Sequence, residues 1–294
     1  MEIGAGDGAR ALQRILGDLP GELRLQHALG PYTTFRIGGP AWALFSPAEP
    51  QALAEAVVRA RAHGFRWRLL GGGSKVLIPD QGFPGLVLTT AHLQGWEESE
   101  GVIQAGAGVP LARLARRGLW KVAGIPGTVG GAVTMNAGTK YGSISEFVVW
   151  VRALMPDGYV HTFLPHECGF AYRDSLFRRL RLPVLEAAFR PAPGPSVDDL
   201  LRERRASQPV GLPSAGCVFR NPPDGPSAGW LIDRLGLKGL RLGDAVVSEK
   251  HANFICNLGR ARSGDVLGLA EHVWERVGRE CGVWLRLELE IVSG

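Results

Sequence analysis

The feature that most constrains this chain is a glycine-rich stretch at residues 124–138, which reads GIPGTVGGAVTMNAG. Glycine raises the entropy cost of ordering, so such a stretch is a poor helix or strand former. Without Cβ atoms, successive backbone N–H groups can approach a bulky anion closely and bond to it. A second cluster, GGGSK at residues 71–75, follows an apolar run. Two such backbone cradles suit a ligand with two phosphates and a large planar ring.

Neither cluster matches a standard nucleotide-binding motif. The chain lacks the P-loop pattern GxxxxGK[ST], and Gly106-Ala107-Gly108 has no third glycine in place before Pro110. Taken alone, each cluster could equally be a turn. Because there are two clusters, and one also carries Thr134 and Asn136, we favour a ligand site.

Composition indicates a soluble globular protein. The chain has 294 residues, enough for two domains, with 45% hydrophobic and 21% charged residues. No apolar run approaches the length of a membrane span, and the N-terminus has no signal-peptide pattern. We therefore expect a cytoplasmic protein without membrane insertion.

Charge and cysteine usage exclude other classes of function. Four widely spaced cysteines form no CxxC pair, so we expect neither a metal site nor a disulfide framework. The formal net charge is +5, and only five of the 33 basic residues are lysine. No basic block interleaves with aromatic residues, so we expect no nucleic-acid partner. The arginines could gather small phosphorylated substrates or simply reflect a GC-rich genome.

Periodicity and turn signals indicate an α+β chain. Helices are expected over residues 8–18, from Ser46-Pro47 to Gly64, and over 110–118, 196–205, 230–237 and 266–277. Strands are expected over 41–45, 66–70, 85–90, 102–105, 147–155, 159–163, 182–189, 217–220, 245–247, 252–256 and 283–291. Pro156-Asp157-Gly158 predicts a hairpin, and Val58 is expected on the inner face of its helix. Residues 191–195 are the clearest linker.

Three positions could carry chemistry. Arg173 follows Tyr172 in a predicted turn and could hold a planar anion, although most arginines are solvated. Cys217 follows the small tripeptide Ser-Ala-Gly, but a free cysteine is usually a buried hydrophobe. Glu288 lies on the non-core face of the last strand, where it is either solvated or a proton donor in a cleft. His251 is more often a structural residue at such a position.

In combination, these segments resemble one family, the UDP-N-acetylenolpyruvoylglucosamine reductases, flavoenzymes of bacterial peptidoglycan synthesis. The resemblance runs from TFRIGG at residues 34–39 through both glycine clusters to the C-terminal strand. It further rests on these segments: YRDS at 172–175, SAGCVFRNP at 214–222, GWLIDRLGLKG at 229–239, VSEKHANFI at 247–255 and GVWLRLELEIV at 282–292. Matches in register along nearly the whole chain make the resemblance specific.

The resemblance implies a two-lobed flavin-binding domain of the vanillyl-alcohol-oxidase-like type at residues 1–190, with lobes at about 20–78 and 79–190. It further implies an α+β substrate domain at residues 196–280 and a C-terminal strand at 281–294 in the active site. FAD is expected to bind non-covalently, with NADPH as hydride donor, a UDP-sugar substrate and a monomeric protein. The implied cofactor residues are Gly71, Gly72, Gly73, Ser74, Lys75, Pro126, Gly127, Thr128, Gly131, Asn136 and Gly138.

The resemblance also implies catalytic roles. Arg173 and Glu288 would stabilise an enolate, Glu288 by donating a hydrogen bond from a protonated carboxyl. Cys217 stands where the family usually has a serine, and its thiol would protonate the α-carbon. The implied substrate contacts are Tyr172, Asn221, Lys238 and His251. The chain lacks the tyrosine-bearing loop of one branch, so it resembles the shorter branch.

Two alternatives stay open at this point. One is a different flavin-dependent oxidase or dehydrogenase of the same superfamily, acting on an alcohol or hydroxy acid. The other is a non-catalytic module that binds a UDP-sugar and carries no flavin.

Overall fold

The computed structural model describes residues 4–292 and divides them into two compact units. The first unit contains the chain up to His27, Ala41–Gly72 and Pro84–Leu201, and the second contains Ala28–Pro40, Gly73–Phe83 and the chain from Arg202 onward. Two short segments of the N-terminal half therefore pack with the C-terminal part. These units are defined by packing, so the ligand-binding domain ranges predicted from the sequence remain predictions.

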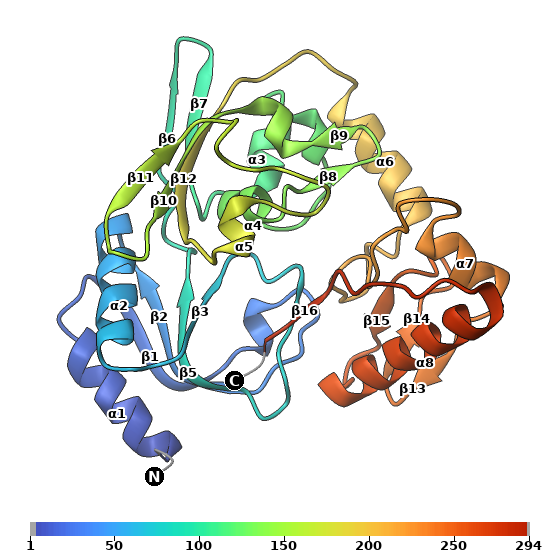
Figure 1. The fold of residues 1–294 in the computed structure, drawn as a ribbon, viewed down its shortest axis with the longest axis horizontal. Helices are drawn as coiled ribbons and strands as arrows, with labels where there is room; N and C mark the ends of the chain where they lie inside the picture. Colours follow the sequence, from blue (N-terminus) through green and yellow to red (C-terminus); the bar gives the residue numbers. More distant parts are fainter. Residues whose placement is uncertain (1–3, 293–294) are drawn as a thin grey trace. The chain divides into compact units, whose positions relative to one another are not determined.

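A four-stranded sheet with two helices forms one part of the first unit (Figure 1). Its strand order is β1 (Gly21–Ala28), β2 (Pro40–Pro47), β5 (Phe83–Thr89) and β3 (Trp67–Leu70), with β3 parallel to β5. Helices α1 (Ala5–Leu16) and α2 (Pro50–Ala62) share a core with these strands. Helix α2 begins later than expected, and Val58 is 37% exposed, so its predicted place on the inner face is wrong. The buried face of α2 consists of Ala52, Leu53, Ala56, Val57 and Ala60.

A five-stranded antiparallel sheet forms the rest of the first unit. Its order is β11 (Val160–Phe163), β10 (Val148–Leu154), β12 (Val184–Phe189), β7 (Val102–Gly106) and β6 (Trp96–Ser99). The hairpin predicted at residues 156–158 is confirmed, because Leu154 pairs with Val160. Short elements complete it: α3 (Leu111–Ala115), η2 (Trp120–Val122), α4 (Val129–Thr134), β8 (Gly138–Thr139), β9 (Gly142–Ser143), η3 (Ile144–Phe147) and α5 (Leu176–Arg179).

The glycine-rich stretch is more ordered than its composition predicts. Although its composition makes it a poor helix or strand former, it contains helix α4 and the first residue of strand β8. Tertiary packing overrides the weak propensity, because Val129 and Val133 of α4 are fully buried in the core under the five-stranded sheet.

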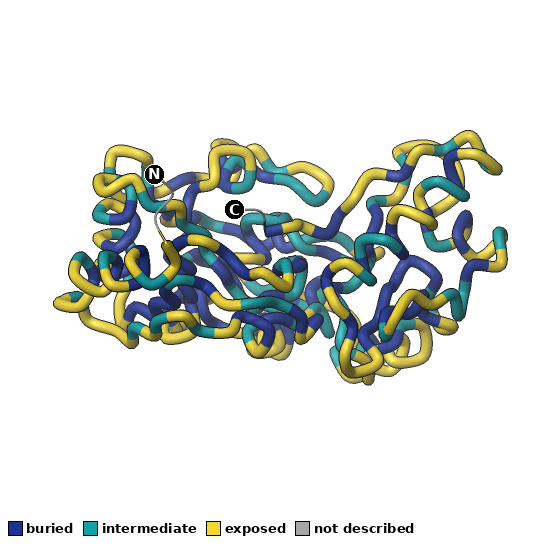
Figure 2. The backbone as a smooth tube through the Cα atoms, turned by 90° about the horizontal axis from the view of Figure 1, so that it is seen from below, coloured by how far each residue is buried: buried dark blue, intermediate teal, exposed yellow. Residues whose placement is uncertain are grey.

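The second unit is a small α+β assembly. Strands β13 (Arg241–Leu242), β14 (Ala245–Val247) and β15 (Ile255–Asn257) form an antiparallel sheet, accompanied by α7 (Ala228–Arg234) and α8 (Ser263–Cys281). The unit also holds the short helix η1 (Gly30–Tyr32), and α6 (Val197–Ser207) leads into it. Its core includes Phe35, Ile37 and Leu77 from the N-terminal half. Strands β14 and β15 are buried along their whole length, whereas β1 has only exposed and half-buried residues; Figure 2 marks buried residues in dark blue and exposed ones in yellow.

The C-terminal segment departs from the predicted nine-residue strand. Only β16 (Glu290–Ile291) is a strand, and it pairs in parallel with β4 (Val76–Leu77). The alternation also breaks, because Leu287 is 41% exposed whereas Glu288 is 4% exposed. The cause is an irregular contact in which the N–H groups of Glu288 and Leu289 both donate to the Val218 carbonyl, at 2.8 and 3.3 Å.

Candidate active site

The two glycine clusters pack against each other in the first unit. A Cβ atom on Gly72 would lie 2.6 Å from the Cα atom of Gly127, and one on Gly71 would lie 2.9 Å from Thr128 Oγ1. Side chains at these positions would push the loop after β3 away from the loop before α4. The glycines are therefore needed for close approach, and together they build one continuous surface of backbone.

The hydroxyl group of Thr128 is buried at this surface. Thr128 Oγ1 is inaccessible to solvent and has no hydrogen-bond partner within residues 4–292. Leaving a buried hydroxyl unpaired is costly, so a ligand group is the natural partner. One helical turn on, Gly131 is exposed and a Cβ there would meet nothing within 4 Å. The backbone surface is thus open where Gly131 faces outward.

Hydrogen bonds tie the loop that carries Arg173 to the glycine-rich stretch. Asn136 Nδ2 donates to the Ala171 carbonyl at 2.9 Å, and Arg173 Nη2 donates to the Gly138 carbonyl at 2.9 Å. Asn136 and Arg173 both have positive φ, at 43° and 54°, a conformation that costs free energy for side chains other than glycine. Such strain persists only where surrounding contacts impose it, so the contacts between the two loops hold both of them in a fixed conformation.

The predicted residues in this loop differ in what they contact. Asn136 is buried, and its Oδ1 accepts from the Ser145 N–H at 3.3 Å, so both ends of its amide bond to the protein. Tyr172 is 54% exposed, with the Arg173 guanidinium carbon 5.1 Å from its ring centroid. Pro126 is exposed beside Gly127. The structure therefore gives Asn136 a scaffolding role and leaves Tyr172 at the surface.

Lys75 joins two of the predicted catalytic positions in the second unit. Its Nζ lies 2.6 Å from Glu288 Oε1 and donates to the Cys217 carbonyl oxygen at 2.8 Å. The Glu288 side chain is 5% exposed and that of Lys75 is 25% exposed. The ammonium donates to Oε1, so that oxygen acts as an acceptor here, whereas the resemblance implies a protonated, donating carboxyl.

The segment that carries Cys217 is held by its backbone. Gly216 adopts φ +74°, and Cys217 forms an isolated antiparallel bridge with Phe254. The Asn253 side chain then bonds to both the N–H and the carbonyl of Phe219, at 2.9 and 2.8 Å. The Cys217 side chain is half-buried. This arrangement fixes the main chain around the thiol while leaving part of the residue accessible.

The cluster at residues 71–75 is divided between the two units after Gly72. Gly73 has φ +60°, and a Cβ there would lie 2.0 Å from the Tyr32 carbonyl oxygen, so only glycine fits. Ser74 is half-buried. The roles of Gly73, Ser74 and Lys75 toward a cofactor remain predictions.

Two of the other predicted substrate residues, Asn221 and His251, lie near the start of α7, and the third, Lys238, pairs with a residue near its end. Asn221 Oδ1 accepts from the Ala228 N–H at 3.1 Å, and a Cβ on Gly229 would lie 3.1 Å from the His251 ring. Lys238 Nζ pairs with Asp233 Oδ2 at 2.7 Å. Burial lowers the pKa of His251, and the charge of Lys238 lowers it further. The structure thus brings Asn221, Lys238 and His251 into one region of the second unit.

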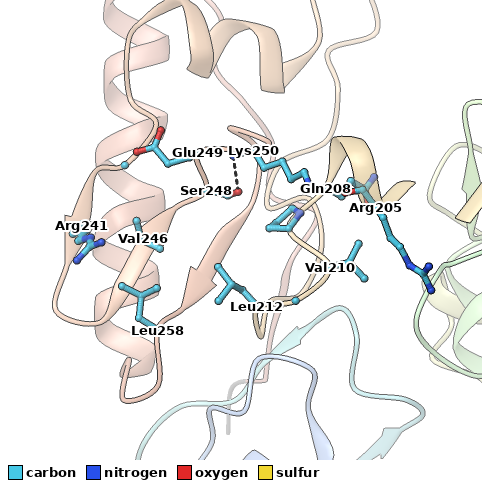
Figure 3. Close-up of a pocket in the computed structure, with 13 residues that line it drawn as sticks. Arg205, Gln208, Val210, Leu212, Arg241, Val246, Ser248, Glu249, Lys250 and Leu258 are labelled. Carbon is cyan, nitrogen blue, oxygen red and sulfur yellow. Dashed lines mark hydrogen bonds between the residues drawn. The ribbon is translucent and has the colours of Figure 1, made fainter. Parts of the chain in front are cut away.

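A pocket of about 690 Å³ lies on the second unit and was not found from the sequence (Figure 3). Arg205, Arg241 and Lys250 bring positive charge to it and Glu249 brings one negative charge, while its apolar residues include Val246 and Leu258. Lys250 Nζ also donates to the Arg205 carbonyl. The lining comes from three separate segments, at 205–212, 239–250 and residue 258, so no local motif signals it.

Within residues 4–292 no group of three or more His, Cys, Asp or Glu side chains could hold a metal ion. In the same range, the structure contains no helix of the length and apolarity that a membrane span requires.

Comparisons with known proteins agree with these features. Residues 41–164 match the family model of an FAD binding domain, and residues 208–292 match that of the UDP-N-acetylenolpyruvoylglucosamine reductase C-terminal domain. A relative of that name from Syntrophobacter fumaroxidans is 41% identical and aligns with 95% of this chain and 86% of its own length. The chain belongs to the UDP-N-acetylenolpyruvoylglucosamine reductase family.

Two further comparisons extend over nearly the whole chain. The reductase from Nostoc sp. is 38% identical over 94% of this chain and 88% of the relative. The crystal structure of the reductase from Thermus caldophilus has a TM-score of 0.76 at 37% identity, covering 94% of this chain and all of that one. The predicted fold class, α+β with a flavin-binding domain and a second α+β part, is confirmed.

Membership of this family makes FAD the cofactor. The residues present fit that group. Both glycine clusters lie within the matched range 41–164, where Gly71, Gly72 and Gly127 place backbone without Cβ atoms beside Thr128, whose hydroxyl has no partner within residues 4–292. A dinucleotide with two phosphates needs such close backbone approach.

Proposed function

We propose that this chain is a reductase of the enolpyruvyl group of UDP-N-acetylenolpyruvoylglucosamine, with NADPH as hydride source and FAD as cofactor, in peptidoglycan synthesis. The relatives that carry this name match over nearly the full length of the chain. The observation that carries the proposal is the cluster formed by Lys75, Cys217 and Glu288. The Glu288 carboxylate and the Cys217 main-chain carbonyl, which belong to residues that the resemblance implies in enolate chemistry, both contact one ammonium group there.

The first unit holds the cofactor in this proposal. Gly71, Gly72 and Gly127 let the backbone approach the two phosphates, and the Thr128 hydroxyl provides a hydrogen bond. When bound, FAD supplies hydride transfer between NADPH and the substrate. Residues 1–190 are proposed as the FAD-binding domain, residues 196–280 as the substrate domain, and 281–294 as the segment that brings Glu288 to the site.

Residues of this chain are proposed to stabilise the charge that develops on the substrate and to supply a proton. Arg173 contributes a guanidinium cation to the carboxylate and enolate charge that develops on the substrate. Glu288 is proposed to act beside the enolate. Cys217 donates its S–H proton to the α-carbon, so that a C–H bond forms, the S–H bond breaks and the thiolate is afterwards reprotonated from water. A thiol is an adequate acid at neutral pH because it is mostly protonated there.

The nucleotide end of the substrate is proposed to use the second unit. Asn221, Lys238 and His251 lie together there, and Tyr172 is proposed as a further contact. The cationic pocket, with Arg205, Arg241 and Lys250, has a size that suits a nucleotide sugar. We further propose that the protein works as a monomer in the cytoplasm.

The absorption spectrum of the purified protein tests the proposal. A yellow protein should release intact FAD on acid or heat treatment, bleach with NADPH, and recover its colour when the enolpyruvyl nucleotide is added. A colourless protein that does not bind added FAD would leave only the UDP-sugar-binding alternative. Bleaching by an alcohol or hydroxy acid, without recovery by the enolpyruvyl nucleotide, would favour the oxidase alternative.

A further inference from the structure

We propose that Lys75 is a positioning residue for Glu288 and for the main chain at Cys217. This inference rests on the function proposed for Glu288 above. The sequence placed Lys75 with the cofactor residues, but its ammonium is directed at Glu288 Oε1 and at the Cys217 carbonyl. The Lys75 ammonium therefore connects the segment that carries Glu288 with the segment that carries Cys217.

Main-chain contacts fix the place of Lys75 relative to Glu288. The Lys75 carbonyl accepts from the Glu290 N–H at 2.8 Å, and the next residue, Val76, pairs with Glu290 in parallel register. On the other side, the Glu288 N–H donates to the Val218 carbonyl at 2.8 Å. The side-chain pair thus closes a loop of contacts that the backbone has already shaped, which reduces the entropy lost in holding a long lysine side chain.

Burial makes the pairing consequential. Glu288 is 4% exposed, and a carboxylate at such a position is strongly disfavoured unless a cation and hydrogen bonds compensate it. Removing Lys75 would take this cation away from a buried carboxylate, so the present position of the Glu288 side chain would be disfavoured. It would also release the Cys217 carbonyl from this donor.

The room around the ammonium is consistent with this role. A Cβ on Gly216 would lie 3.5 Å from Lys75 Nζ, an ordinary contact distance, so the ammonium lies directly beside the residue that precedes Cys217. A lysine ammonium has three N–H donors, and two of them are accounted for by Glu288 and Cys217. Lys75 acts through these residues, so it is distinct from a residue that touches the reacting atoms.

A double-mutant cycle tests the inference on the FAD-loaded enzyme. The variants are Lys75→Met, Glu288→Gln and the double variant, with Lys75→Arg as the conservative replacement. Arg276→Met is the matched control, because it removes an exposed ion pair with Glu280 on α8 in the same unit. Stopped-flow absorbance follows flavin reduction by NADPH and reoxidation by the enolpyruvyl nucleotide separately, and thermal unfolding is recorded for every variant.

Lys75→Met should slow reoxidation on the order of tenfold or more and shift its pH profile, while reduction by NADPH stays nearly unchanged. In the Glu288→Gln background the same change should add little to the rate or to the loss of melting temperature. Lys75→Arg should restore part of the rate, whereas the Arg276→Met control should match the unmodified protein.

Three results would overturn the inference. Additive effects of Lys75→Met and Glu288→Gln on reoxidation and unfolding would show that Lys75 acts independently of Glu288. Loss of FAD absorbance in Lys75→Met would make Lys75 a cofactor residue. If Glu288→Gln alone leaves reoxidation unchanged, the role proposed for Glu288 is wrong, and the positioning role of Lys75 is wrong with it. The single variant Glu288→Gln therefore tests the proposed function separately from the role of Lys75.

Discussion

The side-chain oxygen of Thr128 lies 2.9 Å from the position that a Cβ atom on Gly71 would occupy. The oxygen is buried and unpaired within residues 4–292, although it stands where two glycine clusters meet. A buried hydroxyl without a partner, next to closely packed glycines, suits a ligand that supplies the missing hydrogen bond. Replacing this hydroxyl should therefore affect the stability of the apoprotein and the affinity for FAD in different ways.

Thr128→Val should change these two quantities in opposite directions. Replacing the hydroxyl by a methyl group removes an unpaired buried polar atom, which should stabilise the apoprotein by about 1 kcal/mol. The same change should weaken FAD binding, because the proposed hydrogen bond is lost. Calorimetric unfolding of the apoprotein and fluorescence titration with FAD measure the two effects. Thr90→Val, which replaces another buried hydroxyl without a partner in the described part of the chain, is the control and should leave FAD affinity intact.

Gly131→Ala tests the open face of the same surface. The new Cβ meets no atom within 4 Å, and alanine favours helix by roughly 1 kcal/mol, so the apoprotein should be as stable as before or more stable. FAD affinity should nevertheless fall, because the methyl group enters the space proposed for the cofactor. Gly264→Ala on α8, where a Cβ is equally unopposed, is the matched control. Equal FAD affinity in both variants would contradict the proposed placement.

Glu288→Gln should separate the two half-reactions. Reduction of the bound flavin by NADPH should be nearly unchanged, while reoxidation by the enolpyruvyl nucleotide should slow by roughly a hundredfold or more. The reason is that only the second step develops enolate charge on the substrate. Stopped-flow measurement of each step is the test, and equal slowing of both steps would mean that Glu288 supports the cofactor or the fold.

The four cysteines should differ in reactivity. Burial raises the pKa of Cys168 to about 12 and that of Cys256 to about 11, so neither thiol should react with an alkylating reagent in the folded protein. Cys217 and Cys281 are half-buried and should react. Mass spectrometry of alkylated native and unfolded protein should therefore show labels at two positions in the first case and at all four in the second.

Activity should follow the label at Cys217 alone. Alkylation should inactivate a Cys281→Ser variant, and bound substrate should protect it. Cys217→Ser should retain substantial turnover because it supplies the family's usual donor, whereas Cys217→Ala should keep flavin reduction and lose overall turnover. Near-normal turnover of Cys217→Ala at saturating substrate would assign the proton to water or another side chain.

His251 should make the fold sensitive to acid. Burial lowers the pKa of His251 in the folded state below its ordinary value of 6.5, so the unfolded chain binds more protons as pH falls through that value. The free energy of unfolding should then decrease below about pH 6.5 until the folded-state pKa is reached. His251→Gln should flatten the melting temperature between about pH 8 and pH 5. An exposed histidine on α8, His272, replaced by glutamine, should leave the curve unchanged.

Local patterns in the sequence account for much of the fold. The Pro-Asp-Gly turn, the amphipathic stripe of α8 and the two glycine clusters act over a few residues, where turn chemistry and periodicity decide the conformation. The same segments, in order along the chain, carried the resemblance to the family. Helix α4 does not follow from local pattern, because it forms inside a glycine-rich stretch where Val129 and Val133 are buried in the core.

The sequence by itself determined the family, the cofactor and the residue types available for chemistry, since these depend on short motifs and their order. Only the tertiary structure decided that Glu288 is buried, that Lys75 reaches it, and that Asn136 ties two loops together. The pocket with Arg205, Arg241 and Lys250 also forms only in the tertiary structure, because its lining comes from three separate segments. These features depend on which distant segments pack together. A sequence pattern with a period of two or 3.6 residues does not specify such long-range packing.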